Sequence, residues 1–168
     1  ILALQRQQIT KVMFISTTGV YAQGNHLLTE QSPLKQGSAL VNAERAMQAA
    51  FSCITLRFSG LVNKNRTPAR FLAGKHLDAG LTPTNLIHQD DCIAVITQLL
   101  AKPWQASTYN VSTEQGLPRA QFYIQATRHA GLVAPVFSNA QSYPQRYVSS
   151  QKILQYLDYQ FKYPDILA

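Results

Sequence analysis

The sequence predicts an α/β protein with a parallel sheet. Short apolar runs rich in β-branched residues alternate with longer segments in which apolar residues recur at helical spacing, a pattern typical of strand–helix–strand units. The 168 residues fit one domain and suffice to bury most of their apolar surface. A hydrophobic content of 46% with 14% charged residues indicates a globular chain rather than a disordered one.

The first strand–helix unit occupies the N-terminal third. Lys11–Ile15 is a short apolar run with β-branched residues and predicts a buried strand. The run breaks at Ser16–Gly19, and the polar stretch Ala22–Lys35 predicts a loop. Apolar residues then follow helical spacing, which predicts a helix over Ser38–Phe51.

The second unit begins with a strand over Cys53–Phe58, followed by a basic loop and a short helix over Pro68–Ala73. Asn85–His88 reads as extended chain. Asp90 is expected to cap the amphipathic helix that follows, because acidic side chains accept hydrogen bonds from free N–H groups at helix starts.

The last elements are a strand over Ser107–Val111 and a helix over Pro118–Ala130, opened by proline and stopped by Gly131. Ser149 or Ser150 is expected to cap a final short helix. The alternation of strand and helix therefore continues to the C-terminal part of the chain.

The formal net charge of +7 raises the question of nucleic-acid binding. The 15 Lys and Arg are spread along the chain without a block of five or six, and they form no stripe of alternating basic and aromatic residues. The tightest group is Lys64, Arg66, Arg70 and Lys75. We therefore expect a solvated basic surface and no nucleic-acid partner.

Cellular location is inferred from two absences and two cysteines. No apolar run reaches the ~18–20 residues that span a bilayer, and no signal-peptide pattern opens the chain. Cys53 and Cys92 lie in apolar runs, so we expect buried free thiols, no metal site and a cytoplasmic protein without a membrane partner. The chain starts at Ile1 and its first methionine is Met13, which suggests a fragment.

Five segments carry a resemblance to a known family. In order, they are Phe14–Tyr21 (FISTTGVY), Leu56–Val62 (LRFSGLV), Asn85–Asp91 (NLIHQDD), Tyr109–Ser112 (YNVS) and the tail from Arg146 to Pro164. They resemble the extended short-chain dehydrogenases/reductases, in particular the small atypical NAD-dependent epimerases/dehydratases related to nucleoside-diphosphate-sugar epimerases. Val62-Asn63 replaces the usual Tyr-Gly of the second segment.

The resemblance implies the C-terminal part of a doubly wound, Rossmann-like parallel sheet with a small α/β substrate-side subdomain. On this basis residues 1–60 are expected to be a remnant of the dinucleotide-binding sheet, and residues 61–168 mainly the substrate-side region. The first four strands of the family's sheet would be absent. The strand Lys11–Ile15 would then have an exposed apolar edge, open to another copy or to an N-terminal segment.

Two features of the family are missing from the sequence. None of its eight glycines forms a Gly-rich phosphate-binding turn, so binding of the family's cofactor, NAD or NADP, is expected to be weak or absent. Aligning Glu44 with the family's helix acid places Gln36 and Leu40 at its Tyr-x-x-x-Lys pair. No tyrosine occurs between Tyr21 and Tyr109, so hydride transfer is not expected in this form.

The resemblance also implies candidate site residues. Thr17 matches the family's Ser/Thr that binds the substrate hydroxyl, although it can instead satisfy backbone groups at the strand end. Tyr21 can supply a substitute phenol or simply pack. Residues expected at the cofactor are Ser16, Ser59, Gly60, Leu61 and Val62.

Lys64, Arg66 and Arg70 are expected to hold an anionic substrate such as a nucleotide sugar, with a solvated loop as the alternative. His88, Asp90, Asp91 and Arg57 are interpreted as structural. Two functions remain open: a nucleoside-diphosphate-sugar epimerase/dehydratase-like protein without its hydride-transfer pair, and a non-catalytic binding or regulatory module on the same fold.

Overall fold

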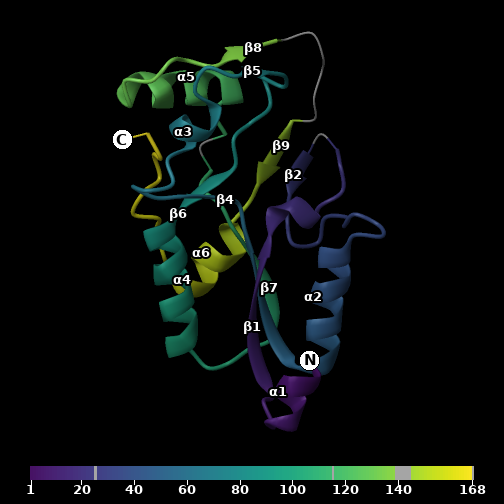
Figure 1. The fold of residues 1–168 in the computed structure, drawn as a ribbon. Coiled ribbons are helices and arrows are strands. Elements are labelled where there is room, and N and C mark those ends of the chain that lie inside the picture. The colour runs from purple at the N-terminus through teal and green to yellow at the C-terminus, as the bar shows by residue number, and fades with distance from the viewer. Residues whose placement is uncertain (25, 115, 139–144, 168) are drawn as a thin grey trace.

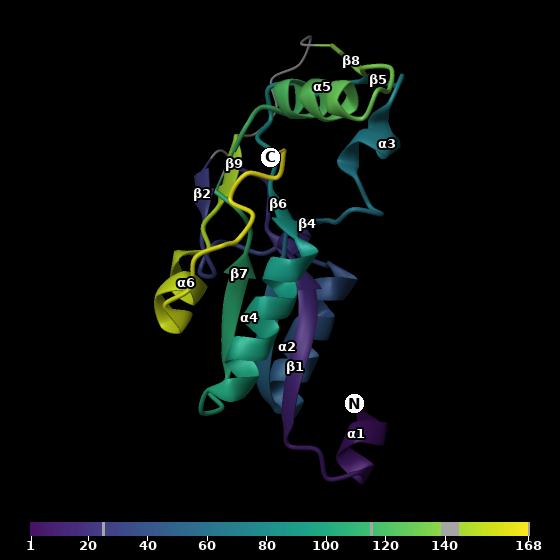
Figure 2. The same cartoon turned by 90° about the vertical axis from the view of Figure 1, so that its left-hand side faces the viewer.

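A computed structural model describes residues 1–24, 26–114, 116–138 and 145–167. Its central element is a three-stranded parallel sheet in the order β1-β3-β7. The sheet strands are β1 (Lys11–Thr17), β3 (Ser52–Phe58) and β7 (Ser107–Val111). Figures 1 and 2 show helix α2 (Ala39–Ala50) on one face of this sheet and helix α4 (Gln89–Ala101) on the other. The predicted α/β class with a parallel sheet is confirmed.

The main core lies between the sheet and α4. Ile54 and Leu56 on β3 pack with Val95 and Leu99 of α4, and each of the four is at most 2% exposed. Side chains alternate between the two faces of a strand, so Thr55, which lies between Ile54 and Leu56, faces α2. Burying one such aliphatic side chain stabilises the fold by roughly 1.5–3 kcal/mol. Strand β3 therefore contributes to packing against both helical layers.

The remaining elements are shorter. They are α1 (Leu2–Arg6), the 3₁₀ helix η1 (Thr18–Val20), β2 (His26–Leu28), β4 (Gly60–Val62), α3 (Pro68–Leu72), β5 (His76–Leu77), β6 (Leu86–His88), α5 (Arg119–His129), β8 (Val136–Phe137), β9 (Arg146–Val148) and α6 (Gln151–Leu157). Six of the strands form three parallel pairs, β2-β9, β4-β6 and β5-β8. Helices α3 and α5 pack together with β5 and β8 into the upper part of the molecule in Figure 1.

Helices α2, α3 and α5 and strands β1, β3 and β7 fall within a few residues of their predicted bounds, whereas α1 was not predicted. The predicted loop Ala22–Lys35, whose Asn25 lies outside the described residues, contains the strand β2 and was wrong at that point. A three-residue strand has too little sequence to show a period, and β2 is defined only by its pairing with β9. The range 61–168 supplies β7 and α4 to the sheet layers as well as the upper part, so it contributes to both regions.

The predicted cap of α4 was also wrong by two residues. The N-cap is His88, whose Nδ1 accepts a hydrogen bond from the Asp90 N–H at 3.2 Å. Asp90 therefore lies inside the first turn, where its negative charge still favours the helix dipole. Ser150 stands at the N-cap of α6, but its hydroxyl bonds to the backbone of Ser112 instead of the helix. Gly131, with φ of +64°, follows α5 as predicted.

Both cysteines are buried and free, as predicted. Burial, followed by the adjacent charge of Asp91, raises the pKa of the Cys92 thiol to about 12. No helix of the described part of the chain is long and apolar enough to span a bilayer.

We expect Cys92 to resist thiol reagents in the folded protein, because the thiolate is the reactive species and the thiol stays protonated. The folded pKa is raised, so stability should be full below pH 9, the ordinary value, and should fall as the pH rises from 9 towards 12. Labelling with a disulfide reagent at pH 8, with and without denaturant, measures the protection. Rapid native labelling of Cys92 would contradict the described burial.

Candidate functional site

Two buried serine hydroxyls lie at the carboxyl ends of neighbouring strands. Ser16 stands in β1 and Ser59 directly follows β3, and each residue is 7% exposed. Neither hydroxyl has a hydrogen-bond partner among the described residues. In open parallel sheets, ligands bind beyond the carboxyl ends of the strands. A buried hydroxyl without a partner costs roughly 1–3 kcal/mol, so this edge of the sheet carries two unsatisfied polar groups.

Thr17 ends β1 beside these hydroxyls. Its Oγ1 accepts a hydrogen bond from the Gly19 N–H at 3.2 Å and caps η1. This is the strand-end role that the sequence left open for Thr17. The hydroxyl proton is not used by this bond, so Thr17 can still donate to a ligand.

Tyr21 lies in the protein interior with 0% of its surface exposed. Its hydroxyl donates to Asn110 Oδ1 at 2.6 Å and accepts from Arg57 Nη1 at 3.0 Å. Burial raises the pKa of the phenol, although the bond from Arg57 opposes the shift. An enclosed neutral phenol with two partners has the geometry of a packing residue, the second of the two roles considered for Tyr21.

Arg57 and Glu44 form a buried ion pair. The guanidinium donates to the carboxylate at 2.6 Å through Nη2 and at 3.1 Å through Nε, with the two side chains 4% and 1% exposed. Burial acts against the charge, but the bonds to Glu44 and Tyr21 outweigh it and raise the pKa of Arg57. We call Tyr21, Glu44, Arg57 and Asn110 the Arg57 cluster. It joins α2, β3 and β7, and Arg57 lies opposite Ser16 in the register of β1 and β3.

Gly60 opens β4 and lies against β6. A Cβ at this position would stand 2.7 Å from Leu86 Cδ2 and 3.2 Å from the Asn85 carbonyl oxygen. The Gly60 N–H also donates to that carbonyl at 3.0 Å. The close backbone approach at Gly60 is therefore made to β6. Leu61 packs against the main core and Val62 is 4% exposed. Strand β4 is thus anchored in the protein interior where the chain passes from the strand ends to the upper part.

A pocket of about 740 Å³ lies at the N-terminus of α4, and we call it the α4 pocket. Its walls are the β4–α3 loop, the first turn of α4, one side of α5 and the C-terminal tail. The lining residues are Val62, Asn63, Lys64, Asn65, Thr67, Pro68, Ala69, His88, Gln89, Asp90, Phe122, Ala126, His129, Ala130, Tyr163, Asp165, Ile166 and Leu167. A volume of this size suits a small molecule.

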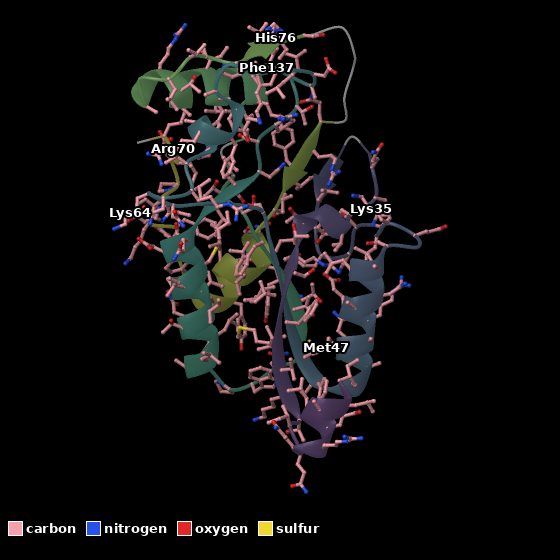
Figure 3. The ribbon with its side chains drawn as sticks, in the orientation of Figure 1. Lys35, Met47, Lys64, Arg70, His76 and Phe137 are labelled. Atoms are coloured by element: carbon pink, nitrogen blue, oxygen red, sulfur yellow. The ribbon has the colours of Figure 1, made fainter. Side chains whose placement is uncertain are left out.

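Of the three basic residues predicted for the substrate, one contributes to this pocket. Lys64 lines the α4 pocket, whereas Arg66 and Arg70 do not. Figure 3 shows Lys64 and Arg70 on the side of the molecule that carries α4, away from α2. The Arg66 guanidinium lies 5.9 Å from the ring centroid of Phe71. Sequence reasoning did not select His88, His129 or Tyr163, since no local pattern links residues so distant in the chain.

The positions aligned with the Tyr-x-x-x-Lys pair do not lie together on a helix. Gln36 lies in the turn before α2, and Leu40 is in the first turn of that helix. Neither side chain can exchange a proton near neutral pH. The described residues also contain no group of three His, Cys, Asp or Glu that could hold a metal ion.

The sequence and fold were compared with known proteins. No family model matches the chain. It is 31% identical over 171 residues to Protein YeeZ of Escherichia coli strain K12, a match that covers 96% of this chain and 61% of YeeZ. The chain therefore spans less than two thirds of this curated relative.

Superposition on solved structures identifies the fold of this chain. A putative NAD-dependent epimerase/dehydratase from Methylobacillus flagellatus superposes with a TM-score of 0.73 and 26% identity, covering 98% of this chain and 63% of that one. UDP-glucuronic acid 4-epimerase from Bacillus cereus, in complex with NAD, gives 0.79 at 16% identity, covering 99% of this chain and 61% of that one. The chain has the NAD-dependent epimerase/dehydratase fold.

The superposed part of this chain, 98% or 99% of its length, carries the strand-end hydroxyls, the Arg57 cluster and the α4 pocket. The resemblance inferred from the five sequence segments is thus confirmed, as is the match to only part of those longer proteins.

Proposed function

We propose that this chain binds a nucleoside-diphosphate sugar or a related anionic small molecule, and that it does not carry out the hydride transfer typical of its fold. The observation that carries the proposal is the pair of buried, unpartnered hydroxyls of Ser16 and Ser59 at the strand ends. Together with Thr17 they can bind the hydroxyl groups of a sugar. Arg66 and Arg70 supply positive charge for a diphosphate on the neighbouring α3 side.

The absence of a tyrosine acid/base supports the non-catalytic part of the proposal. The family's chemistry requires a phenol that exchanges a proton with the sugar. Tyr21 is enclosed by Asn110 and Arg57, and neither Gln36 nor Leu40 has a side chain that can act as an acid or base at neutral pH. This combination favours the binding or regulatory module over an active epimerase.

Binding is tested by calorimetric titration with UDP-glucuronic acid. We expect saturable binding that weakens about tenfold in Ser59→Ala, equivalent to ~1.4 kcal/mol. Ser52→Ala, at the opposite end of β3, serves as the control because that serine is exposed and remote from the strand ends. Equal affinities of the wild-type and Ser59→Ala proteins would remove Ser59 from the site.

We expect no NADH formation when the protein is incubated with NAD and UDP-glucuronic acid. General acid–base groups contribute ~10²–10⁴-fold to rates of this kind, and without the Gly-rich turn NAD itself should bind no tighter than ~10 μM. Absorbance at the NADH band and titration with NAD measure the two quantities. Turnover that disappears in Thr17→Ala would show that Thr17 has taken over the chemistry.

We also propose that the outer edge of β1 pairs with another strand, from a second copy or from an N-terminal segment. Among the described strands, β1 pairs only with β3, and Ile15 is 51% exposed. An apolar unpaired edge is a template for strand addition.

This edge predicts association at low micromolar concentration. Size-exclusion chromatography with light scattering should give a mass above the 18.7 kDa of one chain, and Ile15→Lys should shift the population towards the monomer. A soluble, stable monomer of the unaltered chain, without a co-purifying peptide, would contradict the proposal.

A further inference from the structure

The α4 pocket is separate from the strand-end hydroxyls, because none of Ser16, Thr17 and Ser59 lines it. Its outer wall is the C-terminal tail, which contributes Tyr163, Asp165, Ile166 and Leu167. The tail is therefore part of the pocket. Whether the pocket exists depends on what holds the tail to α4.

A buried carboxylate accepts three hydrogen bonds from the tail. Asp91, with 0% of its surface exposed, accepts hydrogen bonds from the Tyr159 hydroxyl at 2.6 Å and from the backbone N–H groups of Lys162 and Tyr163 at 2.8 and 3.1 Å. The Tyr163 hydroxyl donates to Asp90 at 3.1 Å. These bonds place the last described residues over the first turn of α4.

The pocket has a flat aromatic part and an apolar part. The rings of His88 and Tyr163 lie with centroids 3.8 Å apart and planes inclined by 30°. Across the pocket, α5 contributes Phe122 and Ala126, and Ile166 comes from the tail. Surfaces of this kind bind planar rings by stacking and by burial of apolar area.

The polar groups of the pocket are amides and balanced charges. Asn63, Asn65 and Gln89 carry side-chain amides, which offer both donors and acceptors to the edge of a heterocycle. Lys64 is the one lysine or arginine of the lining, and it is opposed by the carboxylates of Asp90 and Asp165. Two carboxylates disfavour a multiply charged anion such as a diphosphate.

We propose that the α4 pocket is a second ligand site, for a planar heteroaromatic molecule of the nucleoside type that carries no more than one negative charge. The site is independent of the proposed sugar-nucleotide site at the strand ends. The C-terminal tail, held by Asp91, forms its wall, so binding and seating of the tail favour each other.

Uridine is the probe, and UDP is the comparison that adds charge to the same base. Saturation-transfer NMR and calorimetry with the complete chain should show saturable binding of uridine, with UDP at least threefold weaker at low salt. Ala126→Phe, which fills the pocket from α5, should weaken uridine binding at least tenfold. Ala49→Phe, on the exposed face of α2, is the matched control and should leave binding unchanged.

Three results would overturn the proposal. The first is the absence of saturable uridine binding up to about 5 mM. The second is equal binding by the Ala126→Phe and wild-type proteins. The third is tighter binding of UDP than of uridine, lost in Lys64→Ala, which would make the pocket a diphosphate site. Because Ser59→Ala weakens only the strand-end site, failure of one proposal leaves the other measurable.

Discussion

Replacing Glu44 with alanine should lower the free energy of unfolding by about 3–5 kcal/mol, because it leaves Arg57 buried with an uncompensated charge. The guanidinium would keep its bonds to the Tyr21 hydroxyl at 3.0 Å and to the Glu30 carbonyl oxygen at 3.5 Å, but neither oxygen is charged. Native domains are stable by only ~5–15 kcal/mol. Urea unfolding followed by circular dichroism measures the loss.

Two controls separate charge from helix propensity. Arg45→Ala changes the next residue of α2, which is exposed, and should alter stability by less than about 0.5 kcal/mol. The double variant Glu44→Leu with Arg57→Met should recover most of the loss, since apolar residues of similar size often replace a buried ion pair without cost. A loss below about 1 kcal/mol in Glu44→Ala would mean that Arg57 reaches solvent.

Replacing Asp91 with alanine should cost about 2 kcal/mol and release the C-terminal tail. The change removes the acceptor of the Tyr159 hydroxyl and of two backbone N–H groups, and water can satisfy part of what is lost. Burial, followed by the bond to Asp91, raises the pKa of the Tyr159 phenol, so this phenol should titrate nearer its ordinary value in the variant. Amide hydrogen exchange at Lys162 and Tyr163 should accelerate.

Asp90→Ala is the matched control, because Asp90 lies in the same turn but is bonded in the tail only to the Tyr163 hydroxyl. We expect it to change stability by less than about 1 kcal/mol and to leave exchange at Lys162 slow. If the two variants release the tail equally, the buried carboxylate is not the anchor. Uridine affinity measured in both variants would then show whether the pocket depends on the tail.

The sequence by itself determined the long elements. Strand β3 and helices α2 and α4 were predicted within a few residues, because seven or more residues are enough to show a period and each helix has clear ends. The missing Gly-rich turn and the missing tyrosine before α2 were also readable from the sequence. These are properties of residue type and spacing, which can be determined without the tertiary structure.

Only the tertiary structure decided which polar residues meet. Residue order alone does not connect Arg57 with Glu44, or Asp91 with Tyr159, since each pair is separated by many residues and joined by packing of different elements. The same applies to the short strands β2 and β9, which exist only as a pair. Lys64 shows what sequence reasoning cannot reach. Its charge suggested a diphosphate partner, but the folded chain places the carboxylates of Asp90 and Asp165 in the same pocket. Electrostatic energy depends on distances in space, and a sequence specifies those only after the chain has packed.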